Sequence, residues 1–86
     1  MDMADLLQRY FGTRDLDEVS AAALPDGVER MRVDFGMTTD RGQRFALWTL
    51  LLVLGAAPDL DVAFAHEEDR EAARNLMDML AAASPE

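Results

Sequence analysis

The chain has 86 residues, of which 17 are acidic and eight are arginines, and it carries a formal net charge of −9. Half of the residues are apolar, which excludes a disordered chain, and the absence of cysteine excludes disulfides and thiolate metal sites. An acidic surface repels phosphate backbones and anionic lipids, so we expect no direct binding to nucleic acid or membrane.

The length predicts a single domain over residues 1–86. The longest apolar run, residues 45–57, is shorter than the roughly 20 residues that a membrane-spanning helix needs. The first residues are acidic where a secretory signal would be basic. We therefore expect a soluble, cytoplasmic protein.

The first predicted element is an amphipathic helix over residues 3–11. Asp2 can cap its start, and Gly12 can adopt the left-handed conformation that ends a helix. Its apolar residues follow the spacing of one helical face: Met3, Leu6, Leu7, Tyr10 and Phe11.

A second, shorter helix is predicted over residues 15–23. Asp15 and Glu18 have the spacing of a capping box, and Leu16 and Val19 share a face. Pro25 is expected to stop this helix.

Residues 26–36 fit two patterns. As a helix, the segment has a cap at Asp26, an apolar face containing Val28, Met31 and Phe35, and a stop at Gly36. As a strand, its apolar residues from position 31 to 37 alternate with polar ones. The start signal at Asp26 and the stop signal at Gly36 favour the helix.

Residues 40–54 are predicted to form the central helix. The segment is rich in leucine and poor in β-branched residues, and Asp40 and Gln43 provide another start signal. Gly55 is expected to end it. Because residues 45–54 are apolar all the way round, this helix must be covered on every side, by the rest of the chain or by a second subunit.

The segment 59–65 fits a short strand or a single turn of helix, and the chain is expected to change direction near His66. A last helix is predicted over residues 67–83, with acids in its first turn, where the helix dipole favours negative charge. Its apolar side contains six residues: Ala72, Ala73, Leu76, Met77, Leu80 and Ala83.

Together these elements predict an all-α fold, a compact bundle of about five short helices around a central apolar helix. The alternative is a small α+β domain with short strands near 28–37 and 59–65, in which residues 40–54 form the crossover helix.

No constellation of residues predicts catalysis, a cofactor or a metal site. His66 is the only histidine, and Arg70 stands where a zinc-protease motif would need a second one. Without a second catalytic group beside His66, we expect a protein that is not an enzyme.

The arginines are unevenly distributed, which raises the possibility of a binding site. Residues 30–53 contain four arginines and only two acids, whereas the segments on either side are strongly acidic. A cluster of guanidinium groups can bind carboxylates or phosphates, although pairing with the acidic neighbouring helices is the simpler expectation. The candidate binding residues are Arg30, Arg32, Arg41 and Arg44.

The leading functional hypothesis is a non-catalytic protein–protein interaction or structural module that forms a homodimer. Its interface is expected to include Phe45, Trp48 and Leu52 of the apolar helix, or the apolar face of the first helix. The six methionines fill gaps in a small core or soften a binding surface. One alternative is a small acidic inhibitor or antitoxin-like protein that binds a basic surface. The other is a binder of small anionic ligands at the arginines.

Overall fold

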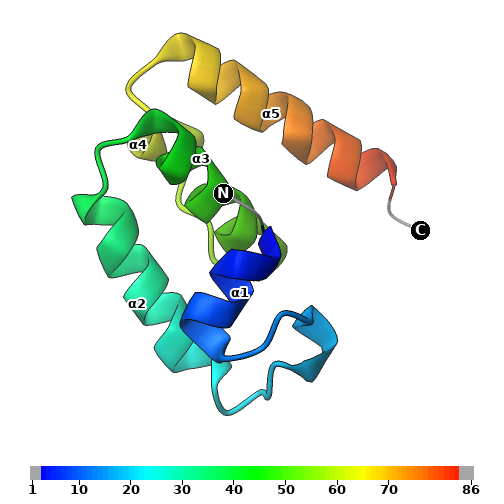
Figure 1. Cartoon of the computed structure of the whole chain (residues 1–86). Helices are drawn as coiled ribbons and strands as arrows, with labels where there is room; N and C mark the ends of the chain where they lie inside the picture. The colour runs from blue at the N-terminus through cyan, green and yellow to red at the C-terminus, as the bar shows by residue number, and fades with distance from the viewer. Residues whose placement is uncertain (1–2, 84–86) are drawn as a thin grey trace.

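A computed structural model describes residues 3–83, and within this range the chain forms helices and no strand (Figure 1). The elements in chain order are α1 (Met3–Phe11), a 3-10 turn η1 (Leu16–Glu18), α2 (Leu24–Met37), α3 (Arg41–Val53), α4 (Leu60–Ala63) and α5 (Glu67–Ala82). This confirms the all-helical prediction, and the alternative strands near 28–37 and 59–65 are both helical instead.

The apolar helix α3 lies at the centre, packed against α1, α2 and α5. Four of its side chains are buried: Leu47, Trp48, Leu50 and Leu51. The predicted start signal is present, since the Asp40 carboxylate accepts a hydrogen bond from the Gln43 amide at 2.9 Å. Gly55 follows the helix with a φ of 78°, in the left-handed region that glycine tolerates.

The first helix also forms as predicted. Its face of Leu6, Leu7 and Tyr10 is buried in the core, and Gly12 follows it with a φ of 74°. The predicted cap, Asp2, lies outside the described residues.

The predicted helix over residues 15–23 is wrong. Asp15 does cap a start, accepting a hydrogen bond from the Asp17 amide, but only the single turn η1 follows. Val19 is extended and packs against the core, whereas Leu16 is exposed. With one apolar anchor in place of a continuous buried face, packing does not stabilise a longer helix here.

The boundaries predicted for the next helix need correction too. α2 begins at Leu24, so Pro25 lies in its first turn, where a missing amide hydrogen costs nothing, and Asp26 is not the cap. The helix also continues through Gly36 to Met37. The predicted inner face holds, because Met31 and Phe35 are buried.

The end of the chain turns as predicted. α4 is a single turn, and the chain changes direction at His66, the residue that precedes α5. α5 packs against α3 and α4, and Ala73 near the middle of the helix is fully buried. Its C-terminal half ends at the edge of the molecule (Figure 1).

The described part of the molecule is flattened, with principal-axis extents of 36 × 34 × 20 Å, and its buried side chains form one cluster around α3. None of the helices within residues 3–83 has the length and apolar character to span a bilayer.

Candidate functional site

The four arginines singled out from the sequence do not gather in one place. Arg30 donates a hydrogen bond to the Tyr10 carbonyl at 2.6 Å and so joins α2 to α1. Arg32 is exposed on α2 and forms no hydrogen bond or ion pair with another described residue. Arg41 and Arg44 lie in the first turns of α3 and line the same cleft. The fold thus brings two of the four together.

Arg44 is half-buried, and its guanidinium group acts as a structural clamp. It donates hydrogen bonds to the carbonyls of Phe35 and Thr38, at 2.7 and 3.0 Å, and to the carbonyl of Ala63. It also lies over the ring of Phe35, 4.1 Å from the centroid. These contacts tie the end of α2 to α4.

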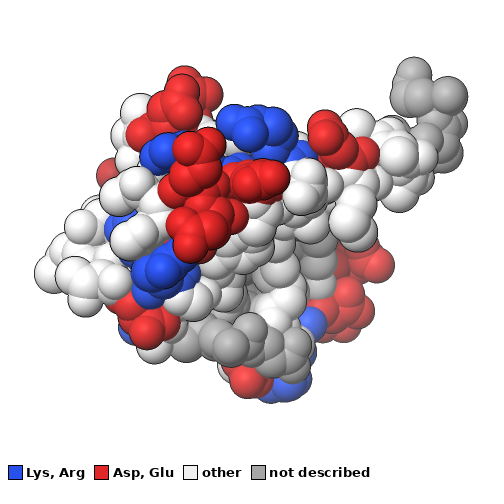
Figure 2. Space-filling model, turned by 90° about the horizontal axis from the view of Figure 1, so that it is seen from above, with Lys and Arg blue, Asp and Glu red and all other residues white. Residues whose placement is uncertain are grey.

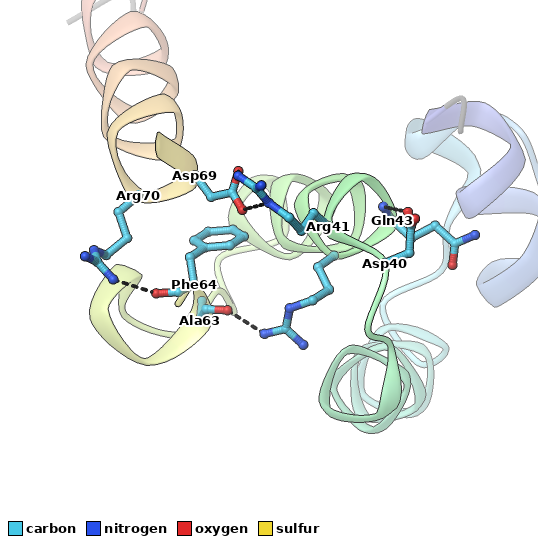
Figure 3. A network of polar contacts seen from close by, with 8 residues as sticks. Asp40, Arg41, Gln43, Ala63, Phe64, Asp69 and Arg70 are labelled. Carbon is cyan, nitrogen blue, oxygen red and sulfur yellow. Dashed lines mark hydrogen bonds and ion pairs between the residues drawn. The ribbon is translucent and has the colours of Figure 1, made fainter. Parts of the chain in front are cut away.

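Arg41 forms a bidentate ion pair with Asp69 in the first turn of α5 (Figure 3). Its Nε and Nη2 atoms donate to the two carboxylate oxygens at 2.9 and 3.0 Å. The hydrogen bonds from Arg41 lower the pKa of Asp69 and raise that of Arg41 itself. Beside this pair, Arg70 donates to the Phe64 carbonyl at 2.9 Å, so two arginines fix the start of α5 (Figure 3).

A cleft of about 480 Å³ opens between the end of α2, the start of α3 and the junction of α4 with α5. Its charged or titratable lining residues are Arg41, Arg44, Asp61, His66 and Asp69. The two guanidinium groups face two carboxylates, and an anion that entered would compete with Asp69 for Arg41. Anion binding at these arginines stays a prediction. The two carboxylates in the cleft offset the two guanidinium charges, so the structure adds no support for it.

The three residues predicted for self-association belong largely to the core. Trp48 is 1% exposed, and its indole nitrogen donates to the Pro58 carbonyl at 2.9 Å. Phe45 and Leu52 are half-buried and pack against the same core. Leu52 also lines a second cleft, of about 400 Å³, together with Met77 of α5. The apolar helix is therefore covered mainly within one chain.

Among the described helices, α5 has the most exposed large apolar residues, three in number. Met79 is 67% exposed, and Met77 and Leu80 are more than 40% exposed, although the helix is anchored by the buried Ala73. The side next to the anchor carries a continuous line of apolar residues, which we call the α5 stripe: Ala72, Leu76, Met79 and Ala83. Leu76 is half-buried, and the other three are exposed.

The other exposed apolar residues are scattered over several elements. α2 exposes the pair Val33 and Met37, one turn apart, while Leu16, Val53 and Val62 each stand on a different element. Isolated apolar residues are normal on a protein surface, whereas a contiguous exposed apolar patch is a candidate for contact with a partner.

Sequence reasoning recognised an apolar side of α5, but the residues that it named did not include Met79. The spacing of apolar residues gives the direction of a face and not what covers it, so the exposure of Met79 was not predictable from the pattern. The sequence does contain one relevant signal, the width of the apolar face around the helix axis. This face extends from Met77 to Met79 and is wider than the surface that α3 and α4 cover.

Comparison of the chain with protein-family models, with curated proteins and with solved structures finds no significant match. The functional proposals below therefore rest on the residues and contacts of this chain.

Proposed function

We propose that this protein is a non-catalytic interaction module that self-associates as a homodimer through the apolar side of α5. The observation that carries the proposal is the exposure of Met79, Met77 and Leu80 on a helix that is firmly held at its other end. Burying a methionine or leucine side chain completely contributes about 1.5–3 kcal/mol. A dimer that covers Met79 buries this side chain on both copies at once.

The charge distribution on α5 supports contact at this end of the helix. Its first turns carry four acids, whereas residues 75–83 contain one charged residue, Asp78. Seen from above, the end of α5 beside the C-terminus is mostly uncharged, whereas charged side chains cover much of the opposite end of this face (Figure 2). For a chain of net charge −9, self-association is least opposed where acids are fewest.

The acidic start of α5 is what supports the second candidate function, a small inhibitor or antitoxin-like protein that binds a basic surface. Glu67, Glu68 and Glu71 are all exposed there. Such a complex would weaken steeply as ionic strength rises, because its attraction is between opposite charges.

The test of self-association is the molar mass in solution, measured by light scattering coupled to size exclusion at two salt concentrations. We expect a mass of twice 9.5 kDa for the wild-type chain at micromolar concentration. Met79→Glu places a charge in the contact and is expected to give a monomer, with its folded state checked by circular dichroism.

The matched control is Met37→Glu, which introduces the same change on α2 at a methionine that is 77% exposed. This variant is expected to remain a dimer. A wild-type chain that stays at 9.5 kDa at both salt concentrations would rule out the proposed self-association.

A further inference from the structure

We infer that the occupant of the α5 stripe is the α5 helix of a second copy, lying antiparallel, with Leu76 level with Met79 of the other copy. This inference rests on the proposed function and specifies its geometry. In a dimer with two-fold symmetry the same surface patch of both copies forms the interface, so each α5 stripe contacts the α5 stripe of the other copy.

The spacing of the α5 stripe suits contact between two helices. Ala72, Leu76, Met79 and Ala83 are separated by four, three and four residues, the pattern that keeps one line of a helix facing a partner helix. In the antiparallel register, Ala72 lies level with Ala83 of the other copy. Small residues at both ends of the contact allow the helices to approach closely around the larger pair in the middle.

Electrostatics selects the antiparallel orientation. Packed helices lie 8–10 Å apart, so a parallel pair would bring the acidic first turns of both copies, residues 67–71, into direct repulsion. In the antiparallel register the centres of these turns are separated by about 26 Å along the helix axis, at a rise of about 1.5 Å per residue. That distance exceeds the Debye length of about 8 Å at physiological ionic strength.

The helix dipoles also favour the antiparallel orientation. Each copy brings the negative C-terminal end of α5 toward the N-terminal half of the other helix, and antiparallel dipoles attract. The stripe itself contains no charged residue, and its flanking residues Asn75 and Leu80 are uncharged as well. No charge therefore has to be removed from water at the centre of the contact.

Cysteine cross-linking tests the orientation directly, because the chain has no cysteine of its own. Ala72 and Ala83 are both exposed, so Ala72→Cys and Ala83→Cys are mild changes. One variant is isotope-labelled, and the two are oxidised separately and as a mixture, then separated and weighed by mass spectrometry. The antiparallel register predicts disulfide formation in the mixture between unlike variants and little in either variant alone.

Met37→Cys is the control for random collision and is expected to cross-link at the background rate. Efficient cross-linking of Ala72→Cys with itself would overturn the inference in favour of a parallel pair. A dimeric mass without cross-linking between the two variants would overturn it in favour of another contact surface, while leaving self-association intact. A monomeric mass would overturn both the inference and the proposed function.

Discussion

The Tyr10 side chain makes one of the contacts that connect α1 to α2. Its hydroxyl donates a hydrogen bond of 2.5 Å to the Asp34 carboxylate, while the ring is buried in the core. Arg9 lies over the ring and 4.0 Å from the same carboxylate. Burial of the phenol, followed by the hydrogen bond to Asp34, raises the pKa of Tyr10 to about 12.

This pKa predicts a loss of stability in alkaline solution. The unfolded chain releases the tyrosine proton near pH 10, whereas the folded chain keeps it until about pH 12. The contribution of the neutral phenol is therefore complete below about pH 10 and lost as pH rises toward 12. We expect the free energy of unfolding, measured with urea at fixed protein concentration, to fall by about 2–3 kcal/mol over that interval.

The amino-acid composition allows the alkaline loss of stability to be assigned to one residue. The chain has one tyrosine, no cysteine and no lysine, so Tyr10 is the one side chain that titrates between about pH 9 and 12. Tyr10→Phe is the matched control. It should be less stable at neutral pH, because Asp34 loses its donor, but its stability should stay flat over the alkaline interval. An equal alkaline loss in Tyr10→Phe would contradict the assignment.

At the scale of elements, Arg44 holds two helices that share little other contact. Its hydrogen bonds reach carbonyls at the end of α2 and in α4. Arg44→Gln is expected to lower the free energy of unfolding by about 2–3 kcal/mol, since it leaves these carbonyls without their charged donor. Arg32→Gln should change it by less than about 0.5 kcal/mol, because Arg32 forms no hydrogen bond or ion pair with another described residue.

Urea unfolding of both variants, followed by circular dichroism, gives the comparison. Equal losses in the two would mean that the effect comes from removing positive charge from an acidic protein and not from the clamp. Arg44→Lys adds a second check. This variant keeps the positive charge. A single ammonium group cannot replace the guanidinium nitrogens that donate to carbonyls of both helices, so part of the decrease in the free energy of unfolding should remain.

Two of the correctly predicted helices, α1 and α3, combine a capping signal in the sequence with a continuous buried face. α3 has the Asp40 cap and four buried residues, and α1 has three buried residues in the predicted positions. Residues 15–23 have the capping signal at Asp15 but only one anchored apolar side chain, Val19. Capping places a helix start, and tertiary packing decides whether the helix continues.

In the candidate site, too, some contacts were predictable from the sequence and others were not. The pairing of arginines with acidic neighbours was expected from charge alone, and Arg41 with Asp69 fulfils it. The role of Arg44 was not predictable, because its partners are carbonyl groups that any residue could provide. Which apolar faces stay uncovered depends on how far α5 extends past α3, a property of the whole packing that no local pattern contains.

At the scale of the whole molecule, net charge and the apolar surface of α5 act against each other. Two copies of charge −9 repel, and the proposed antiparallel contact would reduce this repulsion without removing it. Raising the ionic strength from about 0.01 to about 0.1 M shortens the Debye length from about 30 to about 10 Å. The dissociation constant of the dimer is therefore expected to fall as salt rises, the reverse of the behaviour expected for binding to a basic target.

Sedimentation equilibrium across this salt range measures the constant, and two substitutions at Met79 separate the two forces. Met79→Gln removes apolar burial without adding charge, so it should weaken the dimer by a similar factor at every salt concentration. Met79→Glu adds one negative charge per copy at the contact, so its association should be weakest at low salt and recover most as salt rises. If the wild-type dimer instead dissociates as salt rises, opposite charges hold it together, and the contact lies where the arginines of one copy meet the acids of the other.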